Sequence, residues 1–380
     1  MSQKHDEHES GDLPEPRQGA RKGGISRRKL IAGGAAAGSA LPILHGLIPH
    51  DGIHQALTGA SAAEMEHGSS SDSGDMADVH GGSFGPGFEG PDVDHAANGF
   101  DPSEIVRDFD EGTTRRLPNG RVLREWELVA FDKEIEVAPG VHFPAWTYNG
   151  RVPGPTLRCR EGERLRVRFA NGSGHPHTIH FHGIHPAAMD GVPGIGEDGG
   201  GGVLATGQSF TYEFDAAPFG IHHYHCHTNP LAAHIHKGLY GTFIVDPAGG
   251  RPDADELVMV MNGFDTNFDG SNEVYAVNTV GFHYMRHPIR VRRDEPVRIY
   301  LVNILEFDPI NSFHVHANFF HYFPTGTSLE PVEYTDTIVQ GQGQRGILEL
   351  RFPYVGRYMF HAHKTEFAEL GWMGLFEVTE

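Results

Sequence analysis

Short runs of Val, Ile, Phe and Tyr recur along the chain from about residue 120 to the C-terminus, with turn-forming residues between them. Arg124 to Val137 and Gly162 to Ala170 are two of these runs. β-Branched and aromatic residues favour strands, whereas glycine and proline favour the turns that join strands. The 50 glycines and 25 prolines therefore predict many short strands and tight turns. This pattern predicts an all-β sandwich class.

The strand pattern occurs twice. In the first copy 45 residues separate His180 from His225, and in the second copy 47 residues separate His314 from His361. A Gly-x-x-Gly motif and an apolar run follow each second histidine. Two tandem copies of one sandwich explain this repeat better than a single large fold does. The predicted domains are residues 116–248 and 249–380.

The stretch from Gly220 to Gly241 carries the triplet His225-Cys226-His227 in a strand-like context. Successive side chains of a strand point to opposite faces. We therefore expect His225 and His227 to share one face and Cys226 to point to the other. A thiolate and two imidazoles can then serve two metal sites that are only a few covalent bonds apart. Such an arrangement suits electron transfer between two copper centres.

A second stretch, from His177 to His182, has the same geometry. His180 and His182 are two residues apart and share a face, whereas His177 is an odd number of residues from both. The sequence therefore predicts two layers. One layer holds His177 and Cys226, and the other holds the paired histidines.

The chain contains four His-x-His pairs, each in a strand-like context. Imidazole is a good ligand for copper and zinc, and each pair presents two imidazoles on one face. A single pair is a weak signal, but four pairs at a repeated spacing indicate a metal cluster. The pairs are His180 and His182, His225 and His227, His314 and His316, and His361 and His363.

A separate mononuclear site is indicated by Cys226. A blue copper centre uses two histidines, one cysteine thiolate and a weak or absent axial ligand. Cys226 supplies the thiolate and His177 supplies one imidazole. The second imidazole comes from the loop after Cys226, where His234 and His236 compete.

The first 63 residues predict a twin-arginine export signal. Arg27 and Arg28 precede an Ala/Gly-rich, mildly apolar run, and Ala60-Ser61-Ala62 offers a cleavage site. The alternative is a transmembrane anchor, but glycines and Pro42 make the run a poor span. We expect a periplasmic, cell-surface or secreted protein without stable membrane insertion.

Residues 64–115 are rich in Ser, Gly, Asp and His and have little apolar periodicity. This composition predicts a disordered or loosely attached arm. Its histidines, His67, His80 and His95, could bind metal weakly, but a solvated linker is the favoured interpretation.

Composition narrows the function further. The formal net charge of -20 argues against nucleic acid or an anionic membrane as the main partner. Two cysteines, Cys159 and Cys226, cannot build a disulfide framework. If Cys226 binds a metal, Cys159 remains as a small apolar residue in or near a core.

From about residue 120 onwards, these motifs resemble the multicopper oxidases, and most closely the two-domain, laccase-like branch with blue copper in the first domain. They also resemble copper nitrite reductase. The most specific elements are the four His-x-His pairs, the His-Cys-His triplet and the segment Asn-Gly-x-Val-Pro-Gly-Pro at residues 149–155. The resemblance implies two cupredoxin-like Greek-key sandwiches in tandem.

The resemblance also implies a ligand set for four coppers per chain. It selects His234 as the second type 1 ligand and Leu239 as a non-coordinating axial residue. It implies that His180 and His314 bind type 2 copper. The implied type 3 ligands are His182, His225, His227, His316, His361 and His363.

The chain departs from nitrite reductase at two positions. That family has Asp where His180 stands and no imidazole at the position of His227. Eight histidines favour a trinuclear cluster and O2 as the electron acceptor. In the second domain, Ala362 and Asn311 stand where a thiolate and the equivalent of His177 would be needed, so one blue copper per chain is expected.

The implied activity is that of a laccase-like oxidase. It takes one electron at a time from a small reducing substrate, such as a phenol, an aromatic amine or a metal ion, and reduces O2 to water. Asp190 and Glu366 are candidates for proton delivery, with solvated surface carboxylates as the alternative. The two-domain branch also implies a homotrimer with clusters shared between subunits. The alternatives are copper nitrite reductase and a copper-binding or tolerance protein without turnover.

Overall fold

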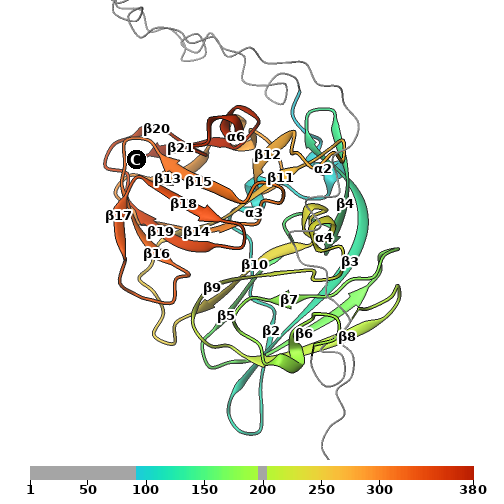
Figure 1. The fold of residues 1–380 in the computed structure, drawn as a ribbon. Coiled ribbons are helices and arrows are strands. Elements are labelled where there is room, and N and C mark those ends of the chain that lie inside the picture. The colour runs from blue at the N-terminus through green and yellow to red at the C-terminus, as the bar shows by residue number, and fades with distance from the viewer. Residues whose placement is uncertain (1–90, 196–202) are drawn as a thin grey trace, which may run out of the picture. The chain divides into compact units, whose positions relative to one another are not determined.

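The computed structural model describes residues 91–195 and 203–380. The predicted export signal, its cleavage site, His67 and His80 lie outside these residues. Two β-sandwiches follow one another along the described chain (Figure 1). Short helices connect some of the strands, and in the described residues none of them has the length and apolar character that a membrane crossing requires.

The first sandwich packs two five-stranded sheets around aromatic side chains such as Trp126, Phe181 and Phe243. One sheet has the order β1 (Phe109–Asp110), β5 (Thr156–Arg160), β10 (Tyr240–Asp246), β9 (Gly220–His225) and β7 (His180–Phe181). The other contains β2 (Thr113–Arg116), β3 (Val122–Ala138), β6 (Arg164–Asn171), β8 (Ser209–Asp215) and, paired with β3, β4 (Val141–Tyr148).

The second sandwich has a six-stranded and a five-stranded sheet around Phe313, Phe360 and Trp372. The larger sheet runs β12 (Val274–Val277), β11 (Asp255–Phe264), β14 (Val297–Asn303), β19 (Arg345–Leu350), β16 (Phe320–Pro324) and β17 (Glu333–Thr335). The smaller sheet runs β13 (Ile289–Arg292), β21 (Met373–Thr379), β20 (Gly356–His361), β15 (Ile310–Val315) and β18 (Thr337–Gly341). The predicted all-β sandwich class is confirmed.

The helices are short and lie at the ends of strands. Among the described residues, four short helical elements each lie between two consecutive strands. They are α4 (Leu231–His236), α5 (His283–Arg286), α6 (Thr365–Glu369) and the single 3-10 turn η3 (Ala187–Met189).

The segment just before the first sandwich differs from the expectation of a disordered arm. Residues 91–115 contain α2 (His95–Asn98), α3 (Pro102–Ile105), β1 and β2. Asp94 and Asp101 cap the two helices, and Pro102 begins the second one, where its missing N–H costs nothing. Burial of Ile105 and Val106 then holds the segment against the sandwiches.

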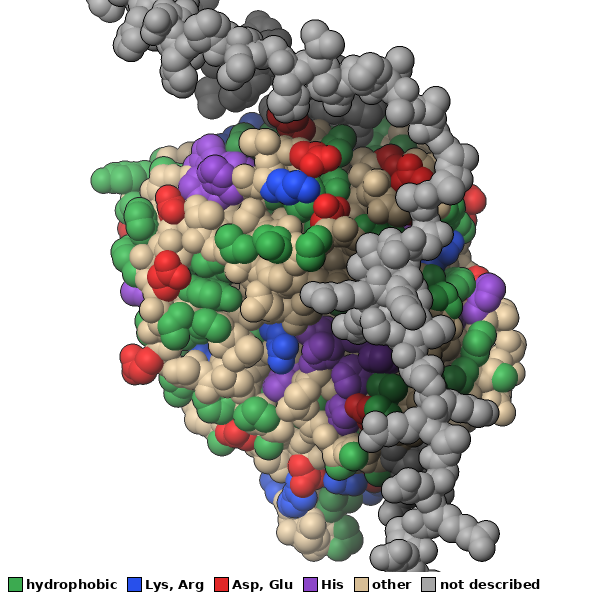
Figure 2. Space-filling model, in the orientation of Figure 1, with side chains coloured by type: hydrophobic (Ala, Val, Ile, Leu, Met, Phe, Trp, Pro, Cys, Tyr) green, Lys and Arg blue, Asp and Glu red, His purple; other side chains and the backbone are tan. Residues whose placement is uncertain are grey.

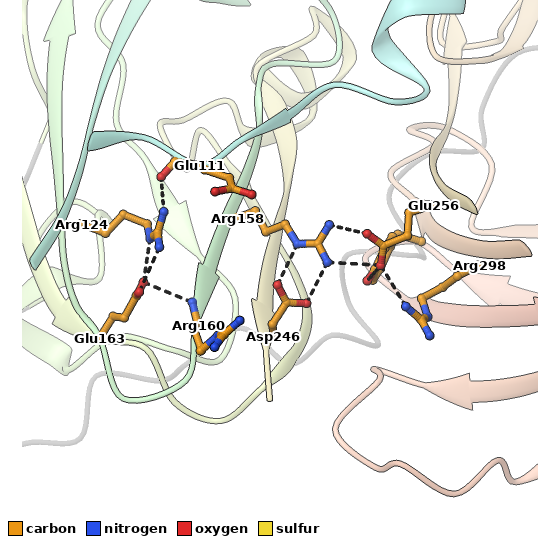
Figure 3. Close-up of polar contacts among 9 residues, drawn as sticks. Glu111, Arg124, Arg158, Arg160, Glu163, Asp246, Glu256 and Arg298 are labelled. Carbon is orange, nitrogen blue, oxygen red and sulfur yellow. Dashed lines mark hydrogen bonds and ion pairs between the residues drawn. The ribbon is translucent and has the colours of Figure 1, made fainter. Parts of the chain in front are cut away.

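The two sandwiches contact each other through an apolar cluster and an ion-pair network. The cluster joins Val152 and Tyr240 of the first sandwich to Val260 and Ile347 of the second. In the network, Arg158 donates to Asp246 at 2.7 Å and to Glu256 at 2.5 Å (Figure 3).

Across that network, Arg298 donates to Glu256 at 2.9 Å and to Glu349 at 2.6 Å. Glu256 therefore joins an arginine from each sandwich (Figure 3). A backbone hydrogen bond from Ile221 N to Thr325 O, 2.8 Å long, ties β9 to the second sandwich as well.

Candidate metal centres

The mononuclear candidate forms where three separate segments of the first sandwich meet. Cys226 directly follows β9, His177 precedes β7, and His234 lies in α4. Cys226 Sγ is 3.2 Å from His234 Nδ1 and 3.9 Å from His177 Nδ1, and the two Nδ1 atoms are 3.1 Å apart. All three side chains are buried. One thiol and two imidazole nitrogens therefore converge on a common point.

The strand that carries the triplet is shorter than predicted. It ends at His225, so Cys226 and His227 lie just beyond it. Pro230 has no N–H for a strand ladder and begins the turn into α4. Cys226 N still donates to Leu239 O at 2.9 Å, which fixes the cysteine against the start of the next strand.

His236, the competitor of His234, is engaged elsewhere. Its Nε2 accepts a hydrogen bond from Asp265 N at 2.9 Å, and its ring packs on Phe143 and Phe307. His234 and His236 are two residues apart in a helix, which places them on nearly opposite sides. The structure therefore brings His234, and not His236, to Cys226.

The surroundings of the trio favour neutral imidazoles. Burial lowers the pKa of His177 to about 3 and the pKa of His234 to about 4. Burial also raises the pKa of Cys226, although hydrogen bonds from Thr228 and Thr178 oppose this rise. Neutral imidazoles and a buried thiol that ionises only beside a cation are a donor set that fits copper. Leu239 is fully buried in the same core and offers no ligand atom.

Two further side chains orient the trio. Ser173 Oγ lies 2.9 Å from His177 Nε2, which leaves His177 Nδ1 directed at Cys226. The ring of Trp146 packs against both His177 and His234, with centroids 5.2 and 4.8 Å away. Sequence reasoning missed both residues, because neither Ser nor Trp carries a ligand signature.

The first set of paired histidines gathers beside this centre. β7 and β9 pair so that His180 stands opposite His225. His182 Nε2 and His225 Nε2 are 2.9 Å apart, and the ring of His227 lies 5.3 Å from that of His180. His225 Nδ1 donates to Cys226 O at 2.8 Å, and His180 Nδ1 donates to Asp190 O at 2.8 Å.

The second set has the same arrangement in the second sandwich. β15 and β20 pair so that His314 stands opposite His361. His316 Nε2 and His361 Nε2 are 3.0 Å apart. His361 Nδ1 donates to Ala362 O at 2.7 Å, and His314 Nδ1 donates to Asp336 O at 3.0 Å. His363 completes the set, 5.4 Å from the ring of His314.

Carbonyl oxygens decide which nitrogen of these rings is free. A carbonyl only accepts, so Nδ1 of His180, His225, His314 and His361 carries the proton and Nε2 keeps its lone pair. Neutral imidazoles held in this way by their other nitrogen are typical of metal ligands. Both sets therefore fit copper.

The two sets lie in different sandwiches of one chain. Ring contacts between neighbouring imidazoles, 5.0–5.8 Å between centroids, join members of the same set in the described residues. Figure 2 shows histidine side chains gathered in more than one place on a single face. Each set offers four imidazoles, half of what a trinuclear cluster of eight histidines needs.

The two carboxylates predicted for proton delivery lie in different settings. Asp190 follows η3, and its carboxylate is 3.1 Å from His180 Nδ1 and 3.3 Å from His185 Nε2. Glu366 lies in the first turn of α6, with an exposed side chain 3.3 Å from Lys364 Nζ. Asp190 is thus next to a paired histidine, whereas Glu366 has a surface ion pair.

His223 is a further buried histidine that sequence reasoning missed. Its ring stacks on His182, with centroids 3.7 Å apart, and neither ring nitrogen has a hydrogen-bond partner in the described part of the chain. Burial lowers its pKa well below 6.5. His223 stands two residues before His225 and therefore lies on the same face of β9. Strand alternation could have predicted this position from the sequence.

The remaining predicted positions agree with a single thiol site. Ala362 is buried between His361 and His363 of the second sandwich. Asn311 is buried on β15 of the same sandwich. Cys159 lies on β5 and is buried in the core of the first sandwich.

Comparison with known proteins identifies the family. A sequence model of a multicopper oxidase domain matches residues 131–249, and a second matches residues 251–380. The chain belongs to the multicopper oxidase family. The family and the cupredoxin-like fold predicted from the motifs are thereby confirmed, and with them a copper-dependent oxidoreductase.

Individual relatives span two activities. A crystal structure of a multicopper oxidase is 65% identical, with a TM-score of 0.74 over 76% of this chain and 100% of that one. Blue copper oxidase from Nitrosomonas europaea is 27% identical, with a TM-score of 0.61 over 67% of this chain and 86% of that one. Copper-containing nitrite reductase from Neisseria gonorrhoeae is 30% identical over 62% of this chain. The match spans 63% of that reductase.

Proposed function

We propose that this protein is a laccase-like oxidase that couples one-electron oxidation of a small substrate to reduction of O2 to water. The observation that carries the proposal is the presence of eight paired imidazoles together with the Cys226 trio. Four coppers per chain follow from this donor set. His177, Cys226 and His234 would hold the type 1 copper, and Leu239, beside them, would contribute no ligand. The type 2 ligands are His180 and His314, and the type 3 ligands are His182, His225, His227, His316, His361 and His363.

The copper ions would supply electron storage and the four-electron chemistry of O2. The chain supplies the connection between the sites. Cys226 is covalently joined to His225 and His227, and the hydrogen bond from His225 Nδ1 to Cys226 O adds a second short link. The buried position of Cys226 keeps water from its sulfur. We assign proton delivery to Asp190, beside His180, and keep Glu366 as the alternative candidate.

We further propose that the cluster forms between subunits. Each chain brings four imidazoles from the first sandwich and four from the second, and ring contacts run within each set. A homotrimer, in which the first set of one chain faces the second set of the next, would complete each cluster. The proposed domains are residues 116–248 and 249–380, preceded by an export signal over residues 1–63 that directs the protein out of the cytoplasm.

Nitrite reduction is the second candidate, favoured by the similarity to the Neisseria enzyme. Imidazoles at His180 and His227 count against it, because they complete a set that a single type 2 copper does not need. Copper storage without turnover is a third candidate. It needs no thiol placed one peptide bond from two cluster histidines.

Metal analysis, an absorption spectrum and gas uptake test the proposal together. We expect about four coppers per chain, an intense blue band, and O2 consumption when a phenol or an aromatic amine is added. Two coppers with nitrite turnover would establish the reductase. Four coppers without uptake of O2 on any donor would support storage instead.

A further inference from the structure

Three histidines outside the copper sets cluster at the junction of the N-terminal segment and the second sandwich. His95 lies in α2, His283 begins α5, and His287 immediately follows α5. The ring centroids of His95 and His283 are 5.0 Å apart, and those of His283 and His287 are 4.8 Å apart. One ligand nitrogen from each ring lies within 4.8 Å of the other two. Segments nearly 190 residues apart in the chain thus bring three imidazoles together.

Polar atoms in this cluster are buried without a hydrogen bond. His283 is only 1% exposed, and its Nδ1 has no partner among the described residues, nor does either ring nitrogen of His95. His283 Nε2 is held at 2.7 Å by Ser103 Oγ, which leaves Nδ1 as its open atom. A buried polar atom without a partner costs free energy comparable to a lost hydrogen bond. A bound cation would satisfy one nitrogen on each of these two rings.

A carboxylate lies beside the three imidazoles. Asp92 Oδ2 is hydrogen-bonded to His287 Nε2, and Asp92 Oδ1 is 4.0 Å from His95 Nε2. Two other charged groups face the cluster, with Asp101 Oδ1 3.5 Å from His283 Nε2 and Arg286 Nη1 3.9 Å from Asp92 Oδ1. The local charge is thus two carboxylates against one guanidinium, which leaves a net attraction for a cation.

We propose that His95, His283 and His287 form a binding site for a divalent transition-metal ion, with Asp92 beside it, and that Zn²⁺ is the ion that the donor set suits best. Three imidazoles match three of the four positions of tetrahedral Zn²⁺, as in sites that leave the fourth position to water. The bound ion clamps residues 91–105 onto the second sandwich. This role is independent of the proposed oxidase activity.

Metal content of the copper-loaded protein tests the site without using activity. After incubation with ZnSO4 and gel filtration, we expect about one Zn²⁺ per chain in the native protein. His287→Gln should lose this ion, because His287 is a ligand whose partly exposed side chain can change without disturbing the core. His142→Gln is the matched control, since His142 is an exposed histidine 3.7 Å from Glu134. Equal zinc in the native protein and in His287→Gln would overturn the proposal.

Hydrogen exchange in residues 91–105 provides a second readout. Zn²⁺ at one hundred times its dissociation constant should slow the opening of this segment about 100-fold, because the ion binds only the closed form. The same addition should leave His287→Gln unchanged. Slow exchange that does not depend on zinc would show that the histidine and aspartate contacts alone hold the segment, and would overturn the clamp.

Discussion

At the scale of single residues, backbone carbonyls set the chemistry of the paired histidines. The carbonyls of Cys226 and Ala362 each fix the tautomer of the preceding histidine, so that Nε2 is the open nitrogen. The sequence predicted which imidazoles share a face, because strand alternation depends only on position. It could not predict the tautomers, which depend on where the chain turns after each strand.

The choice between His234 and His236 gives a matched pair of variants. His234→Gln should abolish the blue band, because His234, unlike His236, directs its Nδ1 at the Cys226 sulfur. His236→Gln should keep the band, because His236 Nε2 bonds to the backbone of Asp265 instead. An absorption spectrum of each copper-loaded variant checks the prediction. Loss of the band in His236→Gln alone would reverse the assignment.

The two candidate proton donors are separated by their surroundings. Asp190→Asn keeps the backbone carbonyl that holds His180 but removes the carboxylate beside it. We expect its kcat to fall by about 100-fold with copper content unchanged, the size typical of a lost general acid. Glu366→Gln should change kcat little, because Glu366 is exposed and paired with Lys364. Rates of O2 uptake with the same phenol check both variants. A larger loss of kcat in Glu366→Gln than in Asp190→Asn would assign proton delivery to Glu366 instead.

At the scale of elements, strand register places the histidines. The pairs His180 with His225 and His314 with His361 stand opposite each other in equivalent strands of the two sandwiches. The repeat in the sequence predicted two equivalent folds, because spacing and glycine positions recur. The short helix α4 was not predicted, since its apolar residues are too few to show a helical period.

The ion-pair network between the sandwiches carries a prediction on stability. Burial opposes the ionisation of Glu256, but hydrogen bonds from Arg158, Tyr300 and Arg298 outweigh it and lower the pKa from 4.5. Glu256→Gln should reduce the free energy of unfolding by about 2 kcal/mol at pH 7, because two guanidinium groups lose their shared partner. Urea titration measures the change. Glu377→Gln is the control, because its ion pairs with Arg290 and Arg357 lie on the surface and should contribute little.

The effect of Glu256 should depend on pH with a defined sign. Because its pKa is lower in the folded state, its contribution is complete above the ordinary value of 4.5 and is lost as the pH falls through the folded value. The difference in stability between the native protein and Glu256→Gln should therefore narrow in acid. A difference that stays constant down to pH 3 would show that Glu256 acts by packing rather than by charge.

At the scale of the whole molecule, each histidine set lies on paired strands of its own sandwich. The sequence showed that eight imidazoles are divided evenly, but it could not show where the sets lie, because that depends on how the sandwiches pack. In the structure, Val152, Tyr240 and Ile347 help to form an interface that leaves each set in its own sandwich. In the proposed trimer, each cluster would take its two sets from different copies of the chain.

Mixed assembly tests the shared cluster. Cys226→Ala chains lack the thiol site, and His361→Ala chains lack one imidazole of the second set. Each variant alone should be inactive. When they are unfolded, mixed and reassembled with copper, some clusters should combine an intact first sandwich with an intact second sandwich and recover about a quarter of native activity. Absence of any recovery in correctly sized oligomers would place the whole cluster within one chain.

In the proposed trimer, the division of the histidines between two sandwiches would tie catalysis to protein concentration. A dissociated subunit would keep its thiol centre and its colour, because that centre is complete within the first sandwich. It would lose the cluster that reduces O2, because in the proposed trimer that cluster takes histidines from two chains. Dilution would thus leave the blue absorbance per chain unchanged and yet abolish O2 uptake. Absorbance would measure the amount of protein, whereas the rate of turnover would measure the fraction that is assembled.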